Sequence, residues 1–304
     1  MARHLRTEDT PNTSPGPAVG GIQAVAVTAA GGTRLHVHVA GPEDGTPVLL
    51  LHGQACSGRV WHEVMSGPLA ESARMIAPDY RGHGRSDKPH RGYRKSSIWA
   101  ADIAALVAHF GLDRPVLVGW SYGTAVSCDY LRHGGDARAF VLVSGGPEAN
   151  PLDPQIRATI APDISRLIKL RLRRGLSAQQ FADAMVRLFT ERELPGQQLA
   201  TLIEDALAIP PYAAFGVASR RYQNDDVLRS FAGPILQIHG AKDRIRLVHA
   251  AERRTPLFRH GRTEIWPDAG HAPFFEDPER FNRTLDRFLR ENNHAEPLGA
   301  RAKR

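Results

Sequence analysis

The chain has 304 residues, of which 42% are hydrophobic and 23% charged, a composition typical of a globular protein with a full hydrophobic core. No apolar run approaches the roughly 20 residues of a membrane-spanning helix, and residues 1–20 lack the apolar stretch of a secretory signal. We therefore expect a cytoplasmic protein with a disordered N-terminal tail. The net charge of +7 comes from scattered arginines without a nucleic-acid-binding motif, so neither nucleic acid nor a membrane is an expected partner. Cys56 and Cys128 do not form a metal-type pair, and no metal or cofactor is expected.

Strands and helices alternate in the first half of the chain. The pattern begins with a hairpin of strands at 22–28 and 33–40, which turns at Gly31 and Gly32. Further strands are predicted at 48–51, 74–77, 115–118 and 140–143, and helices at 60–72, 97–110 and 121–132. The continuous apolar character of these strands is typical of a sheet buried on both faces. The alternation predicts a mostly parallel, doubly wound α/β sheet with right-handed crossovers.

The alternation stops at residue 147 and resumes after residue 231. Between them, helix-like segments cover 154–173, 177–189 and 196–207, followed by a less regular stretch without a convincing strand. Strands at 235–238 and 263–266 and helices at 248–254 and 279–290 then complete the pattern. We predict an α/β core of residues 21–146 and 232–291, a helical cap of residues 147–231 over the carboxyl edge of the sheet, and loose tails at 1–20 and 292–304.

A Gly-x-Ser-x-Gly pentapeptide, Gly119 to Gly123, joins a predicted strand to a predicted helix. This is the sequence form of a nucleophile elbow, in which a tight, strained turn lifts the serine oxygen clear of the sheet. Small residues are needed at 119 and 123 because side chains there would crowd the neighbouring backbone. The context of strand and helix makes Ser121 a candidate catalytic nucleophile.

A serine nucleophile needs a general base, and the base needs a group that holds its tautomer and stabilises its charged form. His271 is the best of the 14 histidines, because its loop between the last strand and the last helix opens on the same sheet edge as the elbow. Asp243 follows the strand at 235–238 and is the preferred orienting acid. The chain order Ser121, Asp243, His271 is the order associated with this elbow.

Two other carboxylates compete for the acid role. Glu148 follows the strand after the elbow, a loop from which some serine hydrolases draw their acid, and it remains an alternative to Asp243. Asp268 lies three residues before His271 and is better explained as a turn residue.

Two backbone N–H groups must stabilise the developing oxyanion. Tyr122, which follows the nucleophile, supplies one, and Gln54, in the loop after the strand at 48–51, is chosen for the other. His52, two residues before Gln54, suits a buried structural role at the end of that strand.

The motifs together resemble the α/β-hydrolase superfamily, and in particular its capped branch of chloroperoxidase-like esterases, carbon–carbon hydrolases of meta-cleavage products and epoxide hydrolases. The resemblance covers 48–290 and is carried by His52-Gly53, the segments 79–86, 119–123 and 270–278, and Asp243. It implies the α/β-hydrolase fold, a mostly parallel sheet with helices on both faces and a helical cap insertion. It also implies that 79–86 is a structural loop near the site, whose His83 is not catalytic.

Two departures from these relatives narrow the chemistry. Haloalkane dehalogenases and epoxide hydrolases of the superfamily use aspartate as the nucleophile, whereas this chain has Ser121. Chloroperoxidase-like members usually carry an aromatic residue after His-Gly, whereas this chain has Gln54, which disfavours perhydrolysis.

The resemblance and the residues favour a serine hydrolase that cleaves a small-to-medium ester, lactone or thioester through an acyl-enzyme. A carbon–carbon bond hydrolase with the same triad and a non-hydrolytic small-molecule-binding or tailoring protein are the alternatives. Apolar cap residues could contact the substrate, although each is better explained as core between cap helices: Leu167, Phe181, Met185, Phe189 and Phe215.

Overall fold

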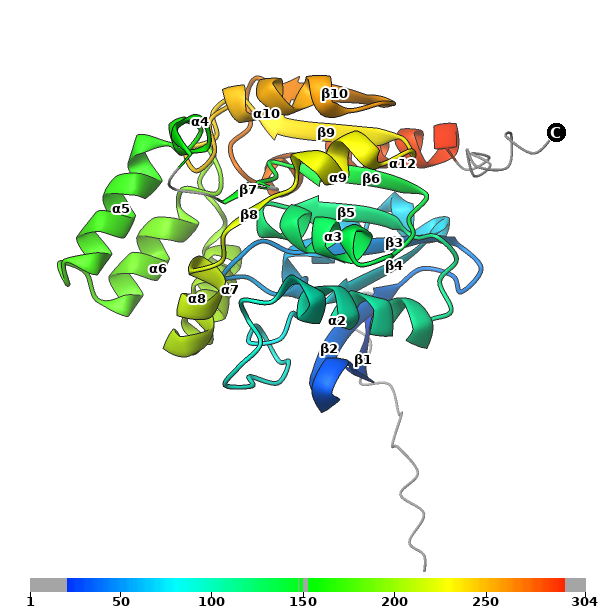
Figure 1. The fold of residues 1–304 in the computed structure, drawn as a ribbon, viewed down its shortest axis with the longest axis horizontal. Helices are drawn as coiled ribbons and strands as arrows, with labels where there is room; N and C mark the ends of the chain where they lie inside the picture. Colours follow the sequence, from blue (N-terminus) through cyan, green and yellow to red (C-terminus); the bar gives the residue numbers. More distant parts are fainter. Residues whose placement is uncertain (1–20, 147, 150–152, 293–304) are drawn as a thin grey trace, which may run out of the picture.

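An eight-stranded, mostly parallel sheet forms the centre of the molecule (Figure 1). The computed structural model describes residues 21–146, 148–149 and 153–292, and the tails predicted at 1–20 and beyond 292 lie outside these ranges. The strands are ordered β1-β2-β4-β3-β5-β6-β9-β10. Only β2 runs antiparallel to its neighbours among them. Their bounds are β1 Gln23–Thr28, β2 Arg34–Ala40, β3 Thr46–Leu51, β4 Ala73–Pro78, β5 Val116–Trp120, β6 Ala139–Val143, β9 Ile235–Gly240 and β10 Gly261–Trp266.

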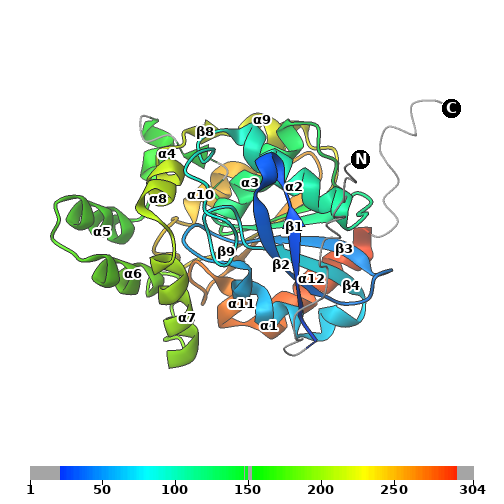
Figure 2. The same cartoon turned by 90° about the horizontal axis from the view of Figure 1, so that it is seen from below.

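Helices cover both faces of the sheet, as Figure 2 shows. One face carries α2 (Ser96–His109), α3 (Tyr122–Arg132) and α9 (Asp225–Ser230), and the other carries α1 (His62–Met65), α11 (Pro273–Glu276) and α12 (Pro278–Asn292). Helix α10 (His249–Arg254) lies between β9 and β10 in the chain. Alternate residues of β3 enter the two hydrophobic cores, with Val48 and Leu50 on the α12 side and Leu49 and Leu51 on the α2 side. This two-sided burial explains why the strand is continuously apolar.

The fold class is confirmed, whereas several element boundaries differ from the prediction. The helix expected at 60–72 is broken into the 3₁₀ turn Gly58–Trp61, α1 and the 3₁₀ turn Pro68–Glu71. Helix α1 ends at Met65, and Pro68, which lacks a backbone N–H, begins a separate turn after Gly67. Asn292, placed in the predicted tail, is the last residue of α12.

The cap segment (residues 147–231) contains helices beyond the carboxyl ends of the strands (Figure 1). They are α4 Pro154–Ala158, α5 Pro162–Leu172, α6 Ala178–Val186, α7 Gly196–Leu207 and α8 Pro211–Ala218. The single helix expected at 154–173 is interrupted, because Ile160 forms a β-bridge with Arg246 and Pro162 starts a new helix.

The prediction of a cap without strands was wrong. Two short strands, β7 (Glu148–Ala149) and β8 (Tyr222–Gln223), pair antiparallel near the two ends of the cap segment. The pairing joins residues more than 70 positions apart in the chain, and two-residue strands leave no periodic signal. The less regular stretch after α7 also contains α8 and α9, and α9 packs on α3 of the sheet layer (Figure 1).

Candidate active site

Ser121 occupies the sharp turn between β5 and α3. Its backbone angles, φ 53° and ψ −114°, lie outside the regions that residues with a side chain normally adopt. The flanking glycines make the turn possible: a Cβ at Gly119 would lie 2.6 Å from the main-chain nitrogen of Thr124, and one at Gly123 would collide with the carbonyl oxygen of Leu51. The close approach of backbone segments therefore explains the Gly-x-Ser-x-Gly pattern.

His271 and Asp243 come together from the loops after β10 and β9. The Nδ1 atom of His271 lies 2.7 Å from Oδ2 of Asp243, and both side chains are buried. The other carboxylate oxygen of Asp243 accepts hydrogen bonds from the main-chain N–H groups of Ile245 and Arg246, each 2.8 Å. Burial acts to raise the pKa of Asp243, but the charge and hydrogen bond of His271 outweigh it and the pKa is lowered. Asp243 is therefore an ionised acceptor for the His271 ring.

The His271 ring lies beside the strand that ends at Ser121. Trp120 Nε1 donates a 2.8 Å hydrogen bond to the main-chain oxygen of His271, and the two rings are 5.7 Å apart. Phe189 of the cap segment packs edge-on against Trp120, 6.2 Å from the His271 ring. Among the described residues, no hydrogen bond joins Ser121 to His271. Catalytic hydrogen bonds of this kind are often long in free enzymes and shorten when substrate binds.

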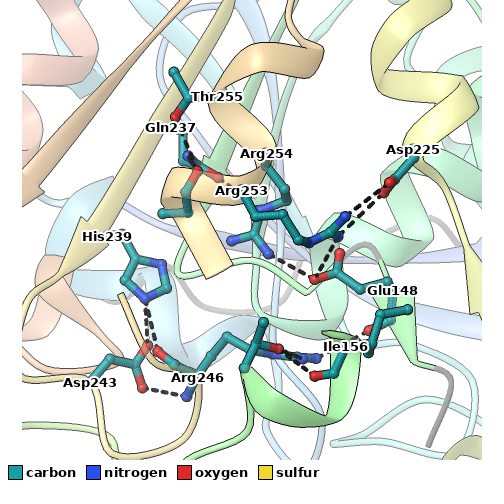
Figure 3. Close-up of polar contacts among 12 residues, drawn as sticks. Glu148, Ile156, Asp225, Gln237, His239, Asp243, Arg246, Arg253, Arg254 and Thr255 are labelled. Atoms are coloured by element: carbon teal, nitrogen blue, oxygen red, sulfur yellow. Dashed lines mark hydrogen bonds and ion pairs between the residues drawn. The ribbon is translucent and has the colours of Figure 1, made fainter. Parts of the chain in front are cut away.

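His239 lies in strand β9, four residues before Asp243, and is a second histidine that contacts the Asp243 carboxylate (Figure 3). Its Nε2 lies 3.4 Å from Asp243 Oδ2 and 2.9 Å from the main-chain oxygen of Arg246. Burial lowers the pKa of His239 to about 4, so the ring is neutral at neutral pH. The sequence interpretation missed this residue, although a histidine inside the otherwise buried strand β9 was a signal that could have found it.

Arg246 joins the loop of Asp243 to the cap segment. Its side chain donates to Thr159 Oγ1 at 2.8 Å and to the main-chain oxygen of Glu148 at 3.1 Å, and its backbone bridges Ile160. Its main chain meanwhile donates to Asp243 and accepts from His239. One residue thus connects the acid, its neighbouring histidine and the cap segment.

The carboxylate of Glu148 lies in a different network from His271. It is fully buried, and its Oε1 accepts from Arg254 at 3.0 Å and lies 3.5 Å from Arg253 (Figure 3). Arg254 also donates to Gln237 of β9 at 2.9 Å. Glu148, near the start of the cap segment, therefore forms a buried ion pair with Arg254 of the core.

Asp268 is exposed and faces outward. It forms ion pairs with Arg280 at 3.4 Å and Arg192 at 3.9 Å, both at the surface. These partners fit the interpretation of Asp268 as a loop residue.

The two residues chosen as oxyanion donors flank Ser121. Tyr122 begins α3 directly after it, and Gln54 follows Gly53, where a Cβ would lie 3.3 Å from Cβ of Ser121. His52 is buried, its Nδ1 lies 2.7 Å from the main-chain oxygen of Gly53, and its Nε2 accepts from Tyr80 at 3.1 Å. Burial lowers the pKa of His52 to about 3, so it is a neutral ring that supports the Gly53 turn.

Arg220, two residues after the cap segment's α8, holds the side chain of Tyr122 through a hydrogen bond. It donates to the Tyr122 hydroxyl and, at 2.7 Å, to the buried carboxylate of Asp129, and its guanidinium lies over the rings of Trp99 and Tyr222. Burial raises the pKa of Asp129 to about 6 despite the opposing charge of Arg220. The sequence interpretation also missed Arg220, because nothing in its local pattern marks a buried arginine.

The five apolar cap residues considered as substrate contacts have different environments. Leu167 belongs to a small core between cap helices, with Phe181 and Met185 packed against it. Phe215 is 65% exposed beside Arg94. Phe189 packs edge-on against Trp120, the aromatic ring next to His271.

Comparison with known proteins assigns the class. Residues 48–284 match the alpha/beta hydrolase family, and the chain belongs to that family. It is 28% identical over 279 residues to a non-heme chloroperoxidase of Streptomyces lividans, and the aligned region covers 87% of this chain and 99% of the relative. It is 25% identical over 275 residues to the 2-hydroxy-6-oxo-2,4-heptadienoate hydrolase of Pseudomonas putida, covering 86% and 94%.

Solved structures of the same fold are named as esterases. A putative aryl esterase from Burkholderia cenocepacia superposes with a TM-score of 0.80 at 32% identity, covering 90% of this chain and 100% of that one. An esterase from Rhodococcus sp. ECU1013 superposes with a TM-score of 0.81 at 31% identity, covering 90% and 99%. The chain is thus an α/β-hydrolase with esterase-like neighbours. Within its described residues, no helix has the length and apolar character needed to cross a membrane.

Proposed function

We propose that this chain is a serine hydrolase that cleaves a small-to-medium ester, lactone or thioester through an acyl-enzyme. The observation that carries the proposal is the strained turn at Ser121 together with the 2.7 Å contact between buried Asp243 and His271. These are the geometric requirements for an exposed nucleophile and an oriented base.

In this mechanism, Ser121 Oγ attacks the carbonyl carbon while His271 Nε2 takes the serine proton. The N–H groups of Tyr122 and Gln54 stabilise the oxyanion, each by about 2.7–4 kcal/mol at the transition state. His271 then protonates the leaving alkoxide or thiolate, and the acyl-enzyme forms as the bond to that group breaks. A water molecule, deprotonated by His271, attacks the acyl carbon and releases the acid. Asp243 stabilises the imidazolium in both halves of the reaction.

The cap segment is proposed to select the substrate. Phe189 supports this role, since it packs beside Trp120 and the His271 ring and so brings the cap segment next to the proposed base. Apolar side chains of this kind favour an uncharged acyl or alcohol group.

A fluorophosphonate probe tests the nucleophile. We expect it to label the wild type and a Ser66→Ala control, whose serine is exposed at the end of α1, and not Ser121→Ala. Hydrolysis of a short p-nitrophenyl ester should fall by several orders of magnitude in Ser121→Ala alone. Labelling that survives Ser121→Ala would overturn the proposal.

Carbon–carbon bond hydrolysis is the second candidate, and its support is the likeness to the 2-hydroxy-6-oxo-2,4-heptadienoate hydrolase. The two activities are compared by measuring kcat/KM for a p-nitrophenyl ester and for the dienoate substrate named for that relative, 2-hydroxy-6-oxo-2,4-heptadienoate. We expect the ester to be the better substrate. A higher kcat/KM for the dienoate would reverse the order of the two candidates.

A further inference from the structure

Three side chains with metal-ligating chemistry meet at the end of β4, apart from the residues assigned to ester hydrolysis. His36 and His38 are two positions apart on β2 and therefore face the same side of the sheet. Asp79 follows β4, and its N–H donates a 2.8 Å hydrogen bond to the main-chain oxygen of His36. The antiparallel pairing of β2 with β4 thus brings all three together.

One potential ligand atom from each of the three residues lies within 4.8 Å of the others. The Nε2 atom of His38 lies 3.4 Å from Oδ1 of Asp79. Among the described residues, the buried Nε2 atom of His36 has no hydrogen-bond partner, and the buried Nε2 atom of His38 has only the 3.4 Å ion-pair contact with Asp79. Buried polar atoms are normally satisfied, and each exception calls for an explanation such as an ion.

His62, at the start of α1, determines how His38 is oriented. Its Nε2 lies 3.1 Å from His38 Nδ1, and the two rings are 4.7 Å apart. A His38 tautomer that donates from Nδ1 to His62 leaves its Nε2 lone pair directed toward Asp79 and His36. Histidine ligands of metals characteristically have their second ring nitrogen held in this way.

We propose that His36, His38 and Asp79 form a binding site for a divalent transition-metal ion, and zinc is one ion that this donor set accommodates. Two imidazole nitrogens and one carboxylate oxygen are a ligand set that zinc accepts, with water completing the coordination. His62 is the positioning residue that holds His38.

The side chains need only a small adjustment to reach coordination distances. Zinc–ligand bonds of about 2.0–2.1 Å in a tetrahedron place the ligand atoms about 3.4 Å apart. Separations of up to 4.8 Å must therefore shorten when an ion binds. Asp79 is already fixed, because Gly58 and Arg85 donate main-chain hydrogen bonds of 2.7 Å to its two carboxylate oxygens.

The charges around the site do not prevent cation binding. Arg59 and Arg85 are the nearby cations that act on His36. The Arg59 guanidinium is paired with the carboxylates of Glu204 and Asp205. A bound ion would join β2, the end of β4 and the turn at Gly58, so its expected effect is on stability and not on the chemistry at Ser121.

Cobalt and zinc titrations of the full chain, after treatment with a chelator, test the proposal. We expect one equivalent of Co²⁺ to bind with visible absorption bands of a low-coordinate nitrogen and oxygen site, and Zn²⁺ to displace it. His36→Gln and His38→Gln should each weaken binding at least about tenfold, whereas His109→Gln, an exposed histidine on α2, should not change it.

Thermal unfolding supplies the second measurement and shows whether the variants fold. Zn²⁺ should raise the unfolding midpoint of the wild type and of His109→Gln, and not that of His36→Gln. If His38→Gln does not fold, the half-buried His36 still provides the comparison. Absence of a saturable equivalent in the wild type, or equal binding by His36→Gln and the wild type, would overturn the proposal.

Discussion

Two buried carboxylates, Asp243 and Glu148, provide a matched test of which acid acts on His271. Asp243 Oδ2 is 2.7 Å from His271 Nδ1, whereas Glu148 is bonded to Arg254. We consider the amide substitutions Asp243→Asn and Glu148→Gln, which remove one buried negative charge each and preserve the shape of the side chain.

The expected effect of Asp243→Asn is on catalysis. Its amide oxygen can still accept from the N–H groups of Ile245 and Arg246, so its NH₂ group faces His271. Because two donors then meet, the imidazole is driven to the wrong tautomer and its charged form loses its partner. The same change in a Ser-His-Asp protease lowers kcat by about 10⁴, which corresponds to about 5.4 kcal/mol of transition-state free energy.

The expected effect of Glu148→Gln is on stability. It makes no contact with His271, so kcat should stay within about threefold, a change of about 0.6 kcal/mol. Its loss leaves the buried Arg254 guanidinium without a counter-charge, which costs about 3–5 kcal/mol of unfolding free energy.

Both variants are assayed for hydrolysis of a short p-nitrophenyl ester and for urea unfolding at the same pH. A loss of less than tenfold in kcat for Asp243→Asn, or a loss of several orders of magnitude for a folded Glu148→Gln, would refute the assignment of the acid.

Three further predictions concern the elbow, the buried histidines and the Arg220 contact. Ser121→Gly should raise the thermal unfolding midpoint while abolishing activity, because glycine relieves about 1–3 kcal/mol of backbone strain at φ 53°; an unchanged or lower midpoint would contradict this. His52 and His239 have folded pKa values of about 3 and about 4, below the unfolded value of about 6.5, so the unfolded state binds more protons between these pH values. The urea unfolding free energy should therefore fall as pH decreases from about 6.5 to 4, by up to about 3 kcal/mol per histidine, and a flat profile would argue against neutral buried rings. Arg220→Met should lower the unfolding free energy by about 3–5 kcal/mol, because it leaves the buried Asp129 carboxylate unpaired. Adding Asp129→Asn should recover part of that loss. Strict additivity of the two substitutions in a double-mutant cycle would show that the pair does not interact.

The parts of the fold that the sequence predicted well are those in which local pattern and tertiary environment agree. Strands such as β5, and β3 from Pro47 onward, are continuously apolar because both faces of the sheet are covered, and that pattern is visible along the chain. The elbow was equally predictable. A Cβ at Gly119 would meet the nearby backbone of Thr124, and a Cβ at Gly123 would meet the backbone of Leu51 in the neighbouring strand.

The parts that were missed depend on contacts between distant segments. The break at Ile160 exists because Arg246 pairs with it, and the strand pair β7–β8 closes the cap segment across more than 70 residues. Arg220 and His239 were missed for the same reason, since each side chain takes its role from a buried partner that its own neighbours in sequence do not indicate.

The hydrogen bonds of Arg246 have a consequence for chimaeras in which the cap segment is exchanged. The same residue bonds to Asp243 through its main chain and to Thr159 and Glu148 through its side chain. A chimaera that replaces the whole cap segment would remove the side-chain contacts of Arg246 and so loosen the support of Asp243, the carboxylate that contacts His271. Grafts that begin after Ile160 keep these contacts, so we expect α5 to α8 to be the exchangeable unit, whereas α4 is retained with the loops of Asp243 and His271.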